Sequence, residues 1–182
     1  MVASDDRLRT NECRIGSQEA FENLVREHQR MIHSLCYRLT GSMEDADDLA
    51  QDTFLQAYQN LAGFRSEAKI SSWLYRIAVN RCLNWRKHVQ RQNRAHQEWS
   101  QLEPETPHEI ARYAGQVQEA LMRLPAKQRA AIVLTTYDGL THAEAAHALG
   151  CSETTVSWRL FAARAKLKRW LKNLPQTGGT AV

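Results

Sequence analysis

Residues that start and end helices recur along the 182-residue chain. They restrict the possible fold more than any other feature of the sequence. Ser42 is followed by Asp45, and Thr141 by Glu144, at the three-residue spacing of helix N-caps. Glycines stand where the intervening helices would end, at Gly41, Gly63, Gly139 and Gly150. No stretch alternates apolar and polar residues over more than a few positions, as a half-buried strand would. The chain is therefore predicted to be all-α.

The predicted helices form two groups separated by a polar segment. The first group comprises helices from Ser17 to about Leu39, from Ser42 to Ala62 and from Ser72 to about Gln90. Residues 91–107 are polar with two prolines near the end, which is typical of a flexible linker. Four shorter helices are expected in 108–174, opened in turn by Thr106, Pro125, Thr141 and Ser152. We predict small helical domains at 17–90 and 108–174, an N-terminal extension at 1–16 and a disordered tail at 175–182.

Charge is distributed unevenly along the chain. Residues 42–57 hold five acids and no Lys or Arg, whereas residues 64–94 hold eight bases and one acid. Residues 151–172 hold six bases and one acid. Blocks of opposite sign predict at least two kinds of partner, one of them polyanionic.

The last two predicted helices match a helix-turn-helix. Ala146, Gly150 and Val156 supply the small contact residue, the turn glycine and the aliphatic anchor of that motif. The final helix buries one apolar stripe, and its opposite side combines hydroxyls, aromatic rings and cations that suit base edges and phosphates. The predicted DNA-contacting residues are Thr154, Thr155, Ser157, Trp158, Arg159, Phe161, Arg164 and Lys168. Alternatively, Trp158 and Phe161 pack on a neighbouring helix.

Two long segments carry a resemblance to a known family. The run DADDLAQDTFLQAY (45–58), followed by FRSEAKISSWLYRIAVNRCLNWRK (64–87), resembles region 2 of the bacterial extracytoplasmic-function sigma factors. The run from 124 to 167 resembles region 4 of the same family. The resemblance implies a transcription initiation factor that binds core RNA polymerase, reads and opens the minus-ten element with region 2, and reads the minus-thirty-five element with the helix-turn-helix. Relatives often carry basic residues where this chain has Ser157 and Ala162, so a different promoter preference is expected.

The resemblance also assigns residues in the first domain. It gives core-polymerase binding to Asp45, Asp48, Gln51 and Asp52. It gives minus-ten DNA binding to Phe64, Arg65, Lys69, Ser71, Arg76, Asn80, Asn84, Arg86 and Lys87. Trp73 fits either the hydrophobic core or the DNA-contacting surface.

The sequence argues against several other classes of protein. Its four cysteines lie far apart without a CxxC pair, so we expect neither a disulfide framework nor a metal site, and we predict buried apolar cysteines. No nucleotide-binding or hydrolase motif occurs, and no cofactor, small-molecule substrate or enzymatic activity is expected. No apolar run reaches membrane-spanning length, so we expect a cytoplasmic protein without membrane insertion.

The sequence also predicts a protein regulator and leaves two rival functions open. The family's usual regulator is an anti-sigma factor, which could hold such a protein at the inner membrane. The main rival is a stand-alone helix-turn-helix regulator that binds its operator without polymerase. A second is an adaptor that binds polymerase without reading DNA, which the basic final helix disfavours.

Overall fold

A computed structural model describes residues 18–64, 69–95 and 109–172 of the chain. These residues contain helices and no strand, which confirms the predicted all-α class. The elements, in chain order, are α2 (Gln18–Thr40), α3 (Met43–Asn60), the 3₁₀ turn η1 (Leu61–Gly63), α4 (Ile70–Ala95), α5 (Glu109–Arg123), α6 (Ala126–Ile132), the π-helical turn η2 (Val133–Tyr137), α7 (His142–Leu149) and α8 (Glu153–Trp170). Within these ranges, no helix is both long and apolar enough to cross a membrane.

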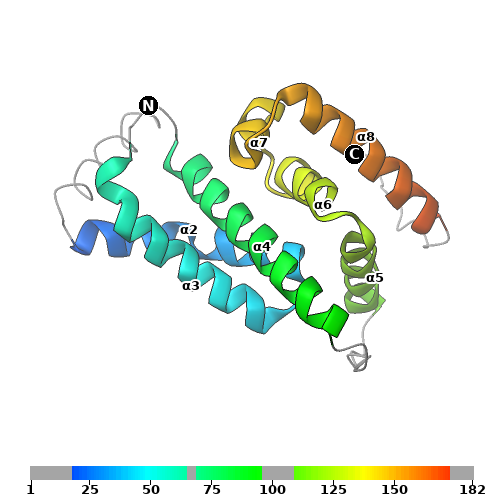
Figure 1. The fold of residues 1–182 in the computed structure, drawn as a ribbon, viewed down its shortest axis with the longest axis horizontal. Helices are drawn as coiled ribbons and strands as arrows, with labels where there is room; N and C mark the ends of the chain where they lie inside the picture. Colours follow the sequence, from blue (N-terminus) through cyan, green and yellow to red (C-terminus); the bar gives the residue numbers. More distant parts are fainter. Residues whose placement is uncertain (1–17, 65–68, 96–108, 173–182) are drawn as a thin grey trace.

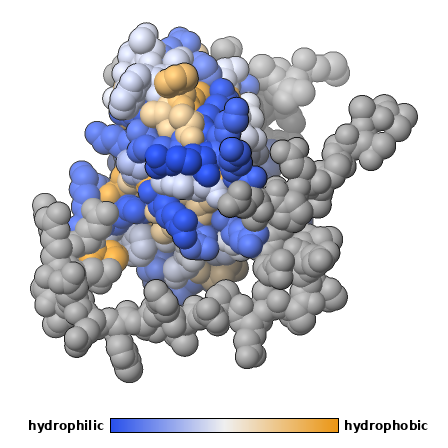
Figure 2. All heavy atoms as spheres, turned by 90° about the vertical axis from the view of Figure 1, so that its right-hand side faces the viewer, coloured by the Kyte–Doolittle hydropathy of each residue, from blue (hydrophilic) through white to orange (hydrophobic). Residues whose placement is uncertain are grey.

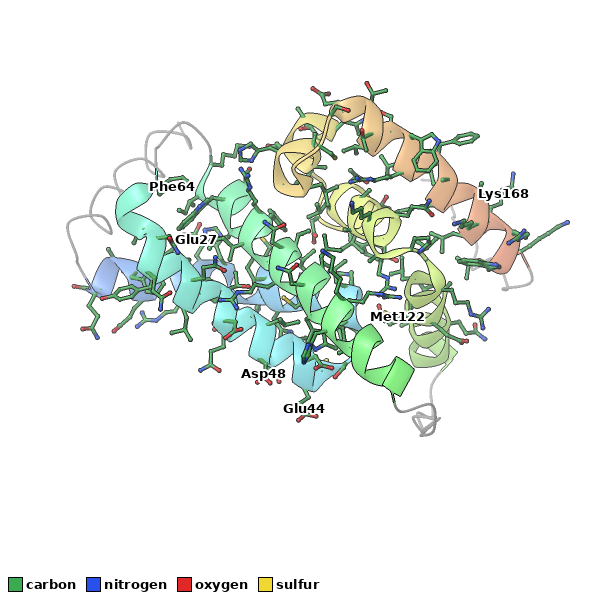
Figure 3. All side chains as sticks on the ribbon, viewed as in Figure 1. Glu27, Glu44, Asp48, Phe64, Met122 and Lys168 are labelled. Atoms are coloured by element: carbon green, nitrogen blue, oxygen red, sulfur yellow. The ribbon has the colours of Figure 1, made fainter. Side chains whose placement is uncertain are left out.

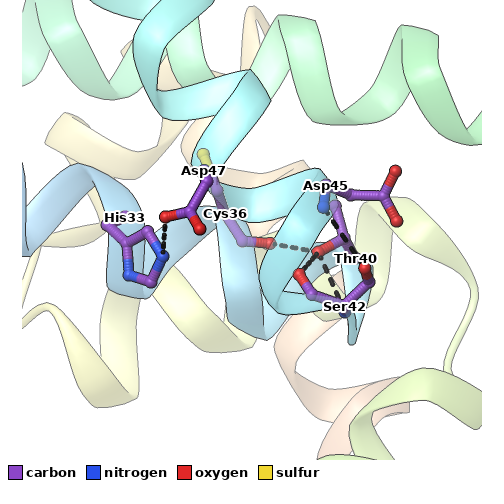
Figure 4. Close-up of polar contacts among 6 residues, drawn as sticks. All are labelled: His33, Cys36, Thr40, Ser42, Asp45 and Asp47. Carbon is purple, nitrogen blue, oxygen red and sulfur yellow. Dashed lines mark hydrogen bonds and ion pairs between the residues drawn. The ribbon is translucent and has the colours of Figure 1, made fainter.

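The first three helices pack around one apolar centre. Ile32, Leu35 and Cys36 of α2 are completely buried, as is Leu74 of α4, and Phe54 of α3 is 8% exposed. The turn between α2 and α3 follows the predicted signals. Gly41 adopts φ +82° and donates its N–H to the Tyr37 carbonyl, so α2 ends there. The Ser42 hydroxyl then accepts from the Asp45 N–H at 3.2 Å and starts α3 (Figure 4).

The second group of helices contains the predicted helix-turn-helix. Thr141 and Glu144 form the expected capping box at the start of α7, and Gly150 ends that helix with φ +58°. Ser152 caps α8, which buries Val156, Leu160 and Ala163. Because these three lie on one side of α8, its other side is free to face solvent or a ligand.

Several boundaries differ from the sequence prediction. The third helix runs from Ile70 to Ala95, past the predicted end near Gln90, because no proline or glycine interrupts His88–Ala95. The helix opened by Pro125 changes from α to π geometry at Val133 before Asp138. The predicted cap at Ser17, the cap at Thr106, the tail and most of the linker lie outside the described residues.

The two groups of helices pack against each other and share one continuous apolar core. Helix α4 contacts α7 and α6, while α2 contacts α5 and η2 (Figure 1). Arg129 of α6 is fully buried at this junction and donates to the Leu39 carbonyl of α2 at 2.5 Å. It also donates to the Met122 and Leu124 carbonyls, at 2.7 and 3.2 Å. Arg129 therefore satisfies carbonyls at the C-terminal ends of both α2 and α5.

The cysteines behave mainly as apolar packing residues. Cys36 and Cys82 are free thiols and are buried between α2 and α4, as predicted. A hydrogen bond with Cys36, together with burial, raises the pKa of the Cys82 thiol far above its usual range. Cys151 is only partly buried, and Cys13 lies outside the described residues.

Candidate nucleic-acid interface

One stripe of α4 gathers four of the side chains predicted to hold the minus-ten strand. Arg76, Asn80, Asn84 and Lys87 are all exposed, at spacings of four, four and three residues. Such spacing places them above one another on a single side of the helix. Two cations and two amides in a row can contact phosphates and the hydrogen-bonding edges of unpaired bases. We call this set the α4 stripe.

The residues at the start of α4 differ in their placement. Phe64 is only 6% exposed, and its ring lies against that of Trp73 with centroids 4.9 Å apart. Trp73 is partly buried against the core. The Phe64 ring is therefore packed against Trp73 and is not exposed. Arg65 lies outside the described residues.

Lys69 and Ser71, at the start of α4, are placed differently: Lys69 contacts the second group of helices, and Ser71 is partly buried. The Lys69 ammonium is 3.3 Å from a carboxylate oxygen of Glu144, the capping residue of α7. Hydrogen bonds from the backbone and side chain of Thr141 lower the pKa of Glu144, and Lys69 lowers it further. Lys69 is therefore paired across the junction between the two groups of helices.

Arg86 also lies apart from the α4 stripe. It is half-buried, and burial lowers the pKa of its guanidinium. Burial and the nearby charge of Arg86 together lower the pKa of Arg129 to about 9. Arg86 is thus turned toward the junction, whereas neighbouring Lys87 is exposed.

The acidic helix α3 presents a second exposed stripe. Glu44, Asp48 and Gln51 are exposed and are followed on the same side by Leu55 and Tyr58, which are 54% and 58% exposed. Figure 3 shows Glu44 and Asp48 pointing away from the helices at the outer edge of the molecule. Leu55 and Tyr58 were not predicted as site residues, although their spacing from Asp48 could have indicated them. We call these five residues the α3 stripe.

Asp45 and Asp52 lie beside this stripe and make local contacts. Asp45 is partly buried in the first turn of α3, where its N–H completes the Ser42 cap. The Asp52 carboxylate is 3.1 Å from Arg81 of α4, which also donates to Gln56 at 2.9 Å. Arg81 therefore joins α3 to α4, a role that no sequence signal indicated.

A groove separates the α3 stripe from α2. It has a volume of about 460 Å³ and includes Gln51 in its wall. The His33 ring nitrogen Nε2 lies 2.9 Å from the Asp47 carboxylate across this groove (Figure 4). The remaining lining residues are Val25, Gln29, Arg30, Ala50 and Phe54.

The outer side of α8 carries most of the predicted duplex-reading residues. Thr154, Ser157, Trp158, Phe161, Arg164 and Lys168 are all exposed. Trp158 and Phe161 are 64% and 75% exposed, so neither is packed within a neighbouring helix. Thr155 and Arg159 are partly buried and make local contacts. Thr155 joins the Ser152 cap, and Arg159 donates to the Cys151 sulfur at 3.3 Å.

A buried carboxylate lies where η2 meets the first domain. The Asp138 side chain is 7% exposed, and Arg38 of α2 lies at ion-pair distance from it, 3.8 Å away. Burial raises the pKa of Asp138 to about 6, with an opposing effect from Arg38. Burial and the Asp138 charge raise the pKa of the nearby Tyr75 hydroxyl as well. The junction is therefore sensitive to the charge on Asp138.

Comparisons with known proteins match both groups of helices. The Sigma-70 region 2 family matches residues 24–94, and the Sigma-70 region 4 family matches residues 114–167. The chain is 41% identical to the ECF RNA polymerase sigma factor SigM of Mycobacterium tuberculosis, over 86% of this chain and 79% of SigM. It is 30% identical to SigW of Bacillus subtilis, over 92% of this chain and 97% of SigW.

A solved structure shares the arrangement of helices. CnrH, determined in complex with the cytosolic domain of CnrY, aligns with a TM-score of 0.74 and 29% sequence identity. The alignment covers 93% of this chain and 99% of that one. The similarity thus extends over both groups of helices.

Proposed function

The chain belongs to the ECF RNA polymerase sigma factors, and from that premise we propose how its exposed helix faces divide the work of promoter recognition. As a sigma factor, it is a transcription initiation factor that binds core RNA polymerase and directs it to specific promoters. The observation that carries the residue-level proposal is that three chemically different helix faces are exposed separately on one molecule. They are the α3 stripe, the α4 stripe and the outer side of α8.

The α3 stripe is the proposed docking surface for core polymerase. Glu44 and Asp48 are exposed carboxylates about one turn apart, and repulsion between them would be relieved by a basic partner. Leu55 and Tyr58 supply apolar area that would be desolvated at the centre of such an interface. Gln51 lies between the two parts. Asp45 and Asp52 act at the edge, where Asp52 also holds Arg81.

The α4 stripe is the proposed path of the separated minus-ten strand. Its cations would follow phosphates, and Asn80 and Asn84 would hydrogen-bond unpaired bases. Lys69 and Ser71 would border the bases at the start of this path. Because Phe64 is buried against Trp73, its proposed role is to position Trp73 at the start of α4 rather than to contact DNA directly. Arg86 would reach DNA only if the junction with Arg129 rearranged.

Helix α8 is the proposed minus-thirty-five reader. Thr154, Ser157, Trp158 and Phe161 lie in its first half, which enters the major groove most deeply in helix-turn-helix complexes. Arg164 and Lys168 would bind phosphates, with Thr155 and Arg159 bracing the start of the helix.

We assign these surfaces to a region 2 domain beginning near residue 17 and a region 4 domain at 108–174. The Sigma-70 matches support this division because they fall on either side of residues 95–113. Because α4 continues to Ala95, the first domain extends a few residues past 90. Core polymerase and chromosomal DNA as partners also support a cytoplasmic location. CnrH was solved with a second protein bound, which supports the proposal that an anti-sigma factor covers these surfaces.

Run-off transcription with core polymerase on a promoter library tests the function directly. The chain together with core polymerase is expected to start RNA from a subset of promoters, whereas neither does so alone. Tight, specific operator binding by the free chain, with no effect on core polymerase, would support the stand-alone regulator instead. Free binding is expected to be weak, at about 10⁻⁴ to 10⁻⁶ M, because each domain offers few phosphate contacts. Polymerase would strengthen it by fixing the two domains at one spacing.

Charge reversal tests the polymerase-docking surface. Asp48→Lys is expected to abolish capture of the chain by core polymerase without unfolding it, because the Asp48 side chain is exposed. Glu19→Lys is the matched control, since Glu19 is an exposed carboxylate on α2, outside the α3 stripe. Equal capture of the Asp48→Lys variant and the wild-type chain would remove α3 from the interface.

A further inference from the structure

The outer side of α8 exposes two large aromatic rings in the middle of a cationic helix. Among the described residues, Phe161 is the most exposed of the large hydrophobic side chains at 75%, and Trp158 follows at 64%. They are three residues apart, so they are neighbours on the helix surface. Figure 2 looks toward the side of the molecule that carries α8 in Figure 1, and it shows hydrophobic side chains near the top, surrounded by hydrophilic ones. Two large aromatic rings exposed side by side on one helix indicate a surface that is covered by a ligand.

A hollow that includes Phe161 in its lining indicates the chemistry of that ligand. It has a volume of about 410 Å³ and runs along α8 from His142 at the start of α7 to Lys168. Leu160, Phe161 and Ala165 supply apolar lining. Arg164 and Lys168 add two cations, and Figure 3 shows Lys168 on α8. The hollow therefore suits an occupant that combines apolar groups with nearby negative charge.

The polar end of the hollow is already organised by the protein. The Ser157 hydroxyl lies 3.1 Å from the His142 ring nitrogen Nδ1, which connects the first helix of the motif to the second. This contact restricts the direction in which Ser157 can offer its remaining hydrogen-bonding capacity. Ser157, Arg164 and Lys168 can thus contact polar base edges and phosphates. The Trp158 and Phe161 rings need an apolar group on the ligand instead.

Base edges in the major groove offer very little for an aromatic ring to contact. The thymine C5 methyl is the one sizeable apolar group there, since cytosine offers only a C5–H at that position and the other groove groups are hydrogen-bond donors or acceptors. Phe161 has no hydrogen-bonding atom, and Trp158 has only its indole N–H. We propose that Trp158 and Phe161 recognise thymine methyl groups, so that this chain selects minus-thirty-five elements with thymine at the positions facing these rings. The proposal rests on the proposed role of α8 as the minus-thirty-five reader.

The test compares thymine with deoxyuridine, which differs only by the missing methyl group. Promoters are first selected by transcription with core polymerase and the full chain from templates randomised across the minus-thirty-five region. Each selected thymine there is then replaced by deoxyuridine. Loss of one buried methyl is expected to lower transcription at subsaturating holoenzyme by about fourfold per contacted thymine. Deoxyuridine in the spacer between the two elements is the DNA control and should have no effect.

Variants of the two rings identify which side chains sense the methyl. Trp158→Ser and Phe161→Ser are expected to abolish the difference between thymine and deoxyuridine at their own positions, which is the coupling that a double-mutant cycle measures. Trp158→Phe and Phe161→Leu keep an apolar side chain and are expected to retain most of the difference. Because both rings are largely exposed, all four variants should fold, which a thermal melt verifies.

The outcomes separate this inference from the proposed function. Selected elements without thymine, or a deoxyuridine effect that is equal in the wild-type chain and both serine variants, would overturn thymine recognition. If Arg164→Ala and Lys168→Ala still weakened transcription in that case, α8 would remain the minus-thirty-five reader. Serine variants with unchanged transcription but weakened capture of a protein regulator would also overturn it, by assigning the rings to that protein. Absence of RNA from every template would refute the sigma-factor function itself.

Discussion

Arg129 joins the C-terminal ends of two helices from different domains, so its replacement tests how those domains are held together. Its guanidinium donates to the carbonyls of Leu39 at the end of α2 and of Met122 and Leu124 at the end of α5. The negative ends of both helix dipoles favour a cation at this point. The arginine is completely buried, and within the described residues it donates to these carbonyls and to the Met122 sulfur. Replacement by methionine keeps an unbranched side chain and removes all four of these hydrogen bonds.

Two opposing terms determine the size of the effect. The Leu39, Met122 and Leu124 carbonyls would lose this donor, and a buried carbonyl without a donor costs roughly 1–3 kcal/mol. Removing a buried cation offsets part of this destabilisation, because burying the charge is itself unfavourable. The Arg129 pKa, lowered to about 9 mainly by burial, reflects that cost. Because the carbonyls stay behind after the substitution, the unsatisfied groups dominate. The expected net loss is about 3–5 kcal/mol of unfolding free energy, a large part of the roughly 5–15 kcal/mol typical of a folded protein.

Urea denaturation followed by far-ultraviolet circular dichroism measures this loss. Arg129→Met is expected to lower the transition midpoint and to separate the unfolding of the two domains into distinct steps, because one of the lost bonds crosses between them. Lys127→Met, an exposed cation on the same helix, is the matched control and should change stability by less than about 0.5 kcal/mol. An Arg129→Met chain as stable as this control would refute the argument that the carbonyls depend on the arginine.

Three further predictions concern pH, helix capping and DNA binding. The folded pKa of Asp138 is about 6 against 3.8 for the free group, so the folded chain binds more protons in that range and loses stability as pH rises through 6. Asp138→Asn should therefore be the more stable chain at neutral pH by on the order of 2–3 kcal/mol, and thermal melts of equal midpoint from acid to neutral pH would contradict this. Thr141→Ala removes the cap of α7 and should cost about 1 kcal/mol in urea denaturation, whereas no change would mean that another group caps the helix. Arg76→Ala and Lys87→Ala should each reduce by about one the slope of the logarithm of promoter affinity against that of salt concentration, and unchanged slopes would place the strand elsewhere.

Local features of the sequence were sufficient to predict the helices and much of the proposed duplex-reading surface. The Ser42 and Thr141 caps form within three residues, and the helix-ending Gly41 and Gly150 have positive φ. The outer side of α8 was predictable because helical periodicity assigns each residue to the buried stripe or the opposite side. The same periodicity places the α4 stripe on one side of its helix. It would also have placed Leu55 and Tyr58 on the same side of α3 as Asp48.

The tertiary structure alone decided which charged and aromatic residues face the junction between the domains. Arg129 meets a carbonyl 90 positions away, and Lys69 meets a carboxylate 75 positions away. Phe64 likewise packs against the ring of Trp73, nine positions further along the chain. Periodicity and capping report only on neighbours within a few residues, whereas these contacts depend on how whole helices pack. The sequence by itself therefore determined the helices and their exposed chemistry, and packing determined which basic residues are held inside the molecule and which remain exposed on the proposed DNA-binding faces.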